Sequence, residues 1–259
     1  MNFAHHLTPK RIAAGTVGIL VVMATALTPA LASASSGTTA TTTAPASCLS
    51  EAIAAKTGPS VSTLQALGDC AVGARLTTLA NLRARVDATS ALTPDHAAAL
   101  DAIIESSQSG LQALKAKIDA DTTLPAVRAD VREVSAGYRV HVLVARQVSL
   151  VRADDLVDAA AARLTSAAGE IQAAITAGQS AGKDESTAAS RLAAMQDAIA
   201  AAQAQVSGQA ALVLALTPAQ WDAGTAAPVL NADRGAITTA RRDLRTASSE
   251  ARAAVAALK

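Results

Sequence analysis

Aromatic residues are almost absent from this chain, which contains only Phe3, Tyr138 and Trp221 among its 259 residues. The core of a β-sandwich or barrel normally draws on many aromatic and β-branched side chains, so an all-β fold is disfavoured. Alanine, the strongest helix former, occupies 68 positions instead. Its small side chain also lets helices approach one another closely. The sequence therefore predicts an all-α fold.

The first 32 residues resemble a signal peptide. Lys10 and Arg11 precede the apolar stretch 12–27, and Ala30-Leu31-Ala32 places small residues where signal peptidase recognises them. We expect cleavage between Ala32 and Ser33, with Ala34/Ser35 as the near alternative. An uncleaved anchor is the other interpretation, because 12–32 is about long enough to span a bilayer. Only in that case would a membrane be a partner.

Residues 33–47 consist of Ser, Thr, Ala, one Gly and one Pro, without a large apolar side chain. This composition predicts a disordered tether. The formal net charge of the whole chain is +1, too near neutral for nucleic-acid binding through bulk electrostatics. We therefore expect a protein that is secreted or associated with the cell envelope, with no nucleic-acid partner.

Cys48 and Cys70 are the only cysteines. In an exported protein, two such thiols most often form a disulfide. A redox or metal-binding pair is the alternative, but it needs closer spacing or additional ligands, and neither is evident. The predicted disulfide would tie the start of the ordered region to the first long helix.

Residues 48–259 are predicted to form one helical domain, in which a short helical turn near the start precedes five long segments. Apolar residues recur in these segments at helical spacing, and most steps are three or four residues. Two segments begin at a Thr-Pro or Leu-Pro pair, which is typical of a helix start. The predicted segments are 60–89, 93–118, 124–177, 184–216 and 228–259.

The third segment is amphipathic at both ends, but its middle carries apolar groups on every side, as in Val140, Leu143, Val148 and Val151. A helix that is apolar all round is buried all round. We therefore predict an antiparallel, coiled-coil-like arrangement of two three-helix bundles that share this helix, with halves at about 60–150 and 150–259. A break near 152–155 that gives one compact bundle, or a strand at 140–144, are the alternatives.

One catalytic motif occurs in the sequence, but the structural context that it requires is not predicted around it. Gly178-Gln179-Ser180-Ala181-Gly182 fits G-x-S-x-G, the nucleophile elbow of serine hydrolases. That elbow requires a strand before the serine and a histidine later in the chain. A helical pattern precedes Ser180, and the last histidine, His141, lies upstream. We expect a turn between helices and no catalytic residues.

No glutamate stands three residues before a histidine, as a carboxylate-bridged metal site in a bundle requires. His141 is expected to face the buried stretch near Tyr138, where it is either a packed histidine or a ligand. Asp154, Asp155 and Asp158 form an acidic cluster close enough to pair with Arg152 and Arg163. We interpret the cluster as helix-surface charge, with weak cation binding as the alternative. The sequence predicts no metal or cofactor site.

The last helical segment is basic. Its cations are Arg234, Arg241, Arg242, Arg245, Arg252 and Lys259, against Asp233, Asp243 and Glu250. Such a face suits anionic wall polymers or lipid headgroups. A solvated face with internal ion pairs is the more common meaning of this pattern.

Three short stretches carry a resemblance, namely Leu114-Lys115-Ala116-Lys117-Ile118, Tyr138-Arg139-Val140-His141-Val142-Leu143 and Leu216-Thr217-Pro218. With them, residues 60–259 resemble the uncharacterised exported, alanine-rich helical proteins of high-GC Gram-positive bacteria. Those relatives often carry a proline near position 146, where this chain has Arg146. The resemblance implies an exported helical protein, and it implies no activity and no functional residues.

We therefore expect a non-enzymatic exported protein that acts as a cell-envelope or extracellular scaffold, with an envelope component or another protein as partner. A carrier of a small ligand or metal, using the buried segment around Tyr138 and His141, is the alternative.

Overall fold

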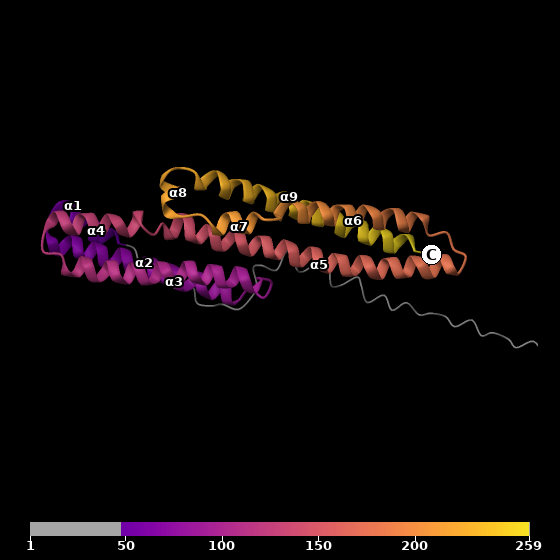
Figure 1. The fold of residues 1–259 in the computed structure, drawn as a ribbon, viewed down its shortest axis with the longest axis horizontal. Helices are drawn as coiled ribbons and strands as arrows, with labels where there is room; N and C mark the ends of the chain where they lie inside the picture. Colours follow the sequence, from indigo (N-terminus) through magenta and orange to yellow (C-terminus); the bar gives the residue numbers. More distant parts are fainter. Residues whose placement is uncertain (1–47, 259) are drawn as a thin grey trace, which may run out of the picture. The chain divides into compact units, whose positions relative to one another are not determined.

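A computed structural model describes residues 48–258 of the chain. Every regular element in this range is helical, which confirms the all-α class (Figure 1). The predicted signal peptide (1–32) and tether (33–47) lie outside the described residues. None of the described helices combines the length and the apolar composition that crossing a membrane requires.

The first three helices are α1 (Leu49–Thr57), α2 (Val61–Asp87) and α3 (Pro94–Ala120). The Ser60 side chain accepts a hydrogen bond from the backbone N–H of Thr63, and Thr93 does the same for His96. These caps satisfy backbone donors that have no partner within the helix. Both helices therefore begin where the sequence predicts.

The predicted continuous helix 124–177 is wrong in one respect, because the chain breaks at 137–139. It forms α4 (Leu124–Ala136), a π-helical segment η1 (Val140–Val144) and α5 (Ala145–Ser180). Arg139 adopts a left-handed backbone, with φ of 42°. The alternative break at 152–155 is also wrong, since that stretch lies inside α5. No strand forms at 140–144.

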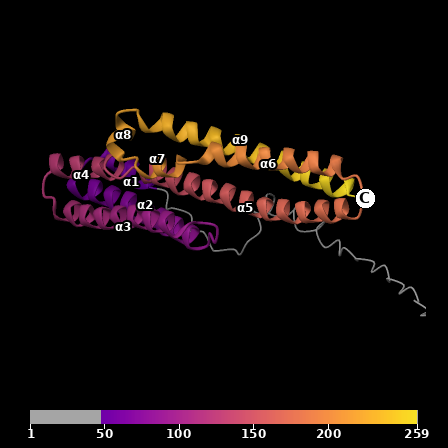
Figure 2. The same cartoon turned by 45° about the vertical axis from the view of Figure 1, so that its right-hand side comes forward.

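The remaining elements are α6 (Ser186–Val206), α7 (Gln209–Leu214), α8 (Pro218–Asp222) and α9 (Ala226–Ala257). The predicted helix 184–216 is interrupted after Val206, where Gly208 has φ of +74°. Glycine takes this conformation without the steric cost that a side chain would bring. The single predicted segment thus becomes two helices, α6 and α7 (Figure 2).

The long helices pack in two sets that meet at the start of α5. Helices α2, α3 and α4 contact one another, and α5, α6 and α9 contact one another (Figures 1 and 2). Helix α5 also contacts α2, α3 and α7, and η1 contacts α2 and α3. Ion pairs reinforce the first set, because Lys115 reaches Asp69 of α2 at 2.6 Å and Lys117 reaches Asp130 of α4 at 2.8 Å.

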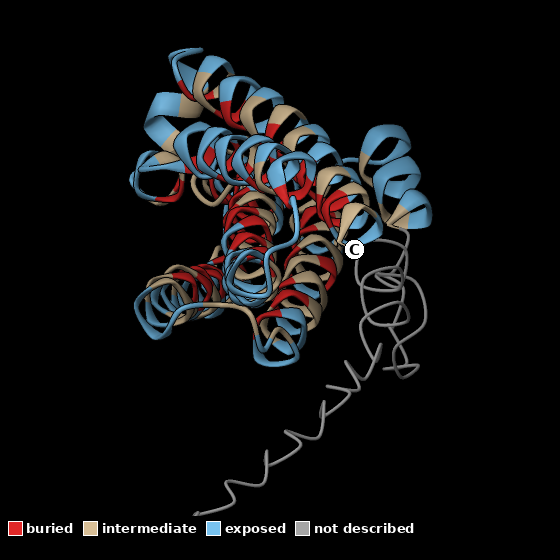
Figure 3. Cartoon of the chain, turned by 90° about the vertical axis from the view of Figure 1, so that its right-hand side faces the viewer, coloured by how far each residue is buried: buried red, intermediate tan, exposed pale blue. Residues whose placement is uncertain are grey.

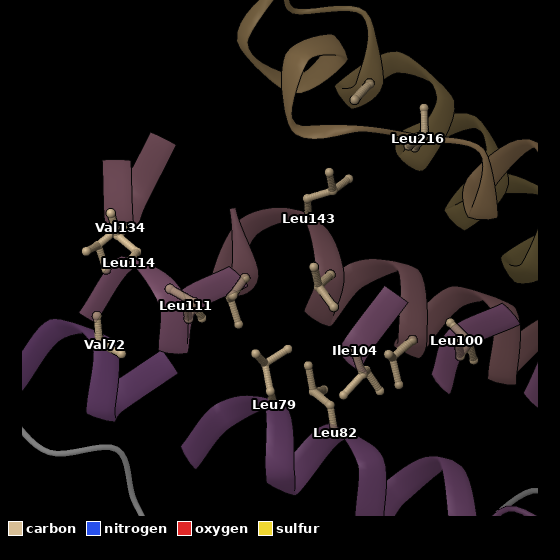
Figure 4. Close-up of a cluster of buried hydrophobic side chains, with 14 of the residues drawn as sticks. Val72, Leu79, Leu82, Leu100, Ile104, Leu111, Leu114, Val134, Leu143 and Leu216 are labelled. Carbon is tan, nitrogen blue, oxygen red and sulfur yellow. The ribbon is translucent and has the colours of Figure 1, made fainter. Parts of the chain in front are cut away.

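Buried residues lie mostly on the sides of the helices that face one another, and exposed residues lie on the outward sides (Figure 3). The close-up shows leucine, isoleucine and valine side chains from α2, α3, α4 and η1 converging, with Leu216 near them (Figure 4). Between α5, α6 and α9 many of the buried positions are alanines, which brings those helices close together.

Candidate functional site

The first half of α5 carries buried polar side chains on more than one side. Gln147 is only 1% exposed, and its Nε2 donates to the carbonyl oxygens of Val213 and Leu216, both at 3.0 Å. These bonds fix the chain that leaves α7 against α5. The predicted all-round apolar stretch is therefore mostly apolar, with exposed residues at His141, Arg146 and Ser149 and one buried amide that ties α5 to the end of α7.

Asp155 faces the beginning of α3. One carboxylate oxygen accepts the backbone N–H of Thr93 at 2.8 Å, and the other lies 2.8 Å from Nδ1 of His96. The Asp155 side chain is 2% exposed. A negative charge at this point favours the helix start, because the unpaired N–H groups there carry partial positive charge. Asp155 thus links α5 to the N-terminus of α3.

Asp154, the preceding residue, faces α9 instead. Asp154 is 2% exposed and Asp233 of α9 is fully buried, and each carboxyl group influences the pKa of the other. None of the four oxygens of these two carboxyl groups has a hydrogen-bond partner among residues 48–258. Burial first, and then the neighbouring Asp233, raise the pKa of Asp154 to about 8. Burial also raises the pKa of Asp233.

The interpretation of Asp154, Asp155 and Asp158 as surface charge is wrong for the first two residues, although Asp158 is exposed. The predicted cationic partners lie elsewhere. Arg152 donates its Nε to the hydroxyl of Thr89 at 2.6 Å, and Arg163 is exposed. Sequence reasoning missed His96 and misplaced Asp233. The available signal was position, since Asp233 falls between Leu230 and Ile237 in the apolar stripe of α9.

The segment around Tyr138 and His141 differs from its prediction. His141 is exposed, so the expectation that it faces the buried stretch is wrong. The part of its ring that neighbouring atoms cover, and then the charge of Arg75, lower the pKa of His141. Tyr138 is half-buried beside Gly110 of α3. Arg139 forms an ion pair with Asp222 of α8.

Within residues 48–258, no group of three or more His, Cys, Asp or Glu side chains is arranged to hold a metal ion. A shallow recess of about 320 Å³ lies between α1 and α2. Serine, threonine and alanine side chains form most of its lining, together with Glu51.

Ser180 is the last residue of α5, and its hydroxyl donates to the carbonyl of Thr176 at 2.9 Å. A helix, not a strand, therefore precedes it. Gly182 then turns the chain with φ of +78°. A turn between helices does follow, but it begins at Ala181, because residues 178–180 belong to α5 and not to the turn as predicted. The geometry of a nucleophile elbow is absent at this point.

Cys48 and Cys70 are joined in the structure, with their sulfur atoms 2.05 Å apart. Cys70 belongs to α2 and Cys48 immediately precedes α1, a helix that has no buried residue. The disulfide is therefore the main covalent restraint on α1. Among the described elements, α1 depends most on this bond, since it buries so little apolar surface.

Helix α9 presents an arginine face. Arg234, Arg241, Arg245 and Arg252 follow one another in steps of seven, four and seven residues, which places them on one side of the helix. All four are exposed, as is Arg242 beside them. The acidic residues lie elsewhere, since Glu250 pairs with Arg191 of α6 at 3.2 Å. In the described part of the chain these five guanidinium groups form no ion pair. The expected internal ion pairs are thus not found on this face.

Comparison with known proteins gives no family assignment: no protein-family model, no curated protein and no solved structure matches this chain.

Proposed function

We propose that this chain is an exported, non-enzymatic helical protein that acts as a scaffold at the cell envelope. Two features support export. The sequence of residues 1–32 has the charge, apolar stretch and small residues of a signal peptide. Cys48 and Cys70 form a disulfide, a bond that persists in oxidising compartments outside the cytosol.

The arginine face of α9 is the observation that carries the scaffold function. Its outermost arginines, Arg234 and Arg252, are 18 residues apart, or about 27 Å along a helix. Each guanidinium group is free to bind phosphate or carboxylate oxygens with two parallel hydrogen bonds. A straight row of unpaired cations fits a linear polyanion that carries repeating negative charges. We therefore propose an anionic envelope polymer as the partner.

The test is sedimentation with isolated envelope fragments. We expect the wild-type protein to co-sediment at low salt and to be released as salt is raised, because the attraction between exposed charges is screened. Replacing Arg234, Arg241, Arg245 and Arg252 with glutamine should weaken binding at least tenfold. The matched control replaces Arg85, Arg128, Arg132 and Arg163, which are also exposed but lie on α2, α4 and α5.

Both variants lose the same net charge, so they separate a local surface from bulk electrostatics. Equal weakening in the two variants would contradict the assignment to α9. Binding to vesicles of anionic lipid, but not to polymer freed of lipid, would identify a membrane surface as the partner instead. No binding to any envelope component would contradict the scaffold function.

A further inference from the structure

The contact between α5 and α9 contains two carboxyl groups where apolar side chains are expected. Asp154 lies in the buried stripe of α5 between Val151 and Val157, and Asp233 lies in that of α9. Burying one unpaired carboxylate is costly, and burying two that face each other is more so. A structure that keeps both in contact needs something to compensate that charge.

No cation from the described chain supplies the compensation. The strongest electrostatic influences on Asp154 are all acidic, namely Asp233 of α9 and Asp155 and Asp158 of α5. His96 of α3 lies against Asp155 and also acts on Asp158.

The other elements packed on α5 do not change this balance. Helix α7 has no charged residue, and the charged residues of α6, Arg191 and Asp197, are exposed. On α2 the nearby cation, Arg85, is exposed and acts on Arg152. His141 of η1 and Arg234 of α9 are exposed as well.

We propose that Asp154 and Asp233 share one proton, so that the α5–α9 contact is a pH-sensitive junction that weakens when this proton is lost. A carboxylic acid beside a carboxylate is the stable arrangement when two such groups lie together without a cation. The raised pKa of Asp154, about 8, agrees with this arrangement. In such a pair the proton belongs to both groups together.

The sign of the pH effect follows from the two states. In the unfolded chain an aspartic acid loses its proton near pH 4. The folded protein keeps the shared proton up to about pH 8. Between about pH 4 and pH 8 it therefore binds one more proton than the unfolded chain does. The contribution to stability is complete below about pH 4, is lost as pH rises through this window, and is constant above it.

The experiment follows urea unfolding by circular dichroism between pH 5 and pH 9, in the presence of EDTA. From pH 6 to pH 8 the folding equilibrium constant should fall roughly 50-fold more in the wild type than in Asp154→Asn. Asparagine keeps the shape and can donate to Asp233 without titrating. Asp233→Asn should reduce the same pH dependence and leave only the part that the burial of Asp154 causes by itself. Asp197→Asn, an exposed site on α6, is the control and should keep the wild-type slope.

A second measurement needs no variant. The infrared carbonyl band of a protonated buried carboxylic acid should be present at pH 6.5 and disappear by pH 9. Equal pH slopes in wild type and Asp154→Asn, or no such band at pH 6.5, would overturn the proposal. So would a rise of the wild-type unfolding midpoint on adding calcium, magnesium or zinc at pH 8 that Asp154→Asn lacks, since a metal ion would then bridge the pair.

Discussion

Buried polar side chains at the start of α5 each have a separate structural consequence. Gln147 donates to two carbonyl oxygens at the end of α7, while Asp155 accepts from the start of α3. Such groups stabilise a fold only while they stay paired, because an unpaired buried polar atom costs its full desolvation energy. The contacts that the start of α5 makes with α7 and α3 are therefore sensitive to single substitutions.

Replacing Gln147 with leucine should destabilise the protein by about 1–3 kcal/mol. Leucine is similar in size to glutamine but has no amide group, so both hydrogen bonds are lost. The Leu216 carbonyl is then left without its side-chain donor. Urea unfolding followed by circular dichroism measures the effect. Gln172→Leu, at an exposed site of the same helix, is the control and should stay within about 0.5 kcal/mol of the wild type. Equal effects at the two sites would contradict the role of Gln147.

Individual polar contacts between helices could not be predicted from the sequence. The apolar stripe of α9 places Asp233 at a buried position, whereas Asp154 is interpreted from the sequence as surface charge, and nothing local indicates that α5 and α9 bring the two together. The same holds for His96 and Asp155, which are 59 residues apart. The disulfide could be predicted, since the chain has only two cysteines and its first residues resemble a signal peptide.

Helix starts follow closely from sequence, whereas interruptions inside apolar stretches do not. Caps at Ser60 and Thr93 mark where α2 and α3 begin. The break before η1 depends on a left-handed Arg139, and arginine gives no sign of that conformation. The turn at Gly208 did have a signal, the glycine itself, but the regular apolar spacing around it favours one continuous helix.

Glycines inside helices differ in how much space surrounds them. A Cβ atom on Gly169 of α5 would meet no neighbouring atom within 4 Å, whereas one on Gly110 of α3 would collide with the Tyr138 ring. Gly169→Ala should stabilise the protein by roughly 0.5–1 kcal/mol, because alanine favours helix. Gly110→Ala should destabilise it by about 1 kcal/mol, because the ring must move.

Thermal unfolding of both variants measures the difference. In a Tyr138→Leu background the Gly110→Ala change should no longer destabilise, because the colliding ring is gone. A stabilising Gly110→Ala in the native background would show that Tyr138 moves away without cost.

The whole molecule combines an alanine-rich helical framework, a disulfide near its beginning and an exposed arginine face near its end. The all-α class follows from composition alone, because alanine is abundant and aromatic residues are scarce. Which residues of neighbouring helices face one another could not be read from the sequence, since alanine-lined seams are similar to one another. The sequence predicts that this face is basic. It does not predict that the arginines lack ion pairs, because that depends on Arg191 of α6, which pairs with Glu250.

The account rests on a chain that is exported, oxidised and held at the envelope. The most direct test alkylates free thiols in growing cells before lysis and then follows the full-length protein through fractionation. We predict that the protein is found with the envelope, is released by salt, and is alkylated at Cys48 and Cys70 only after chemical reduction. Recovery from the cytoplasmic fraction with both cysteines already alkylated would contradict the account.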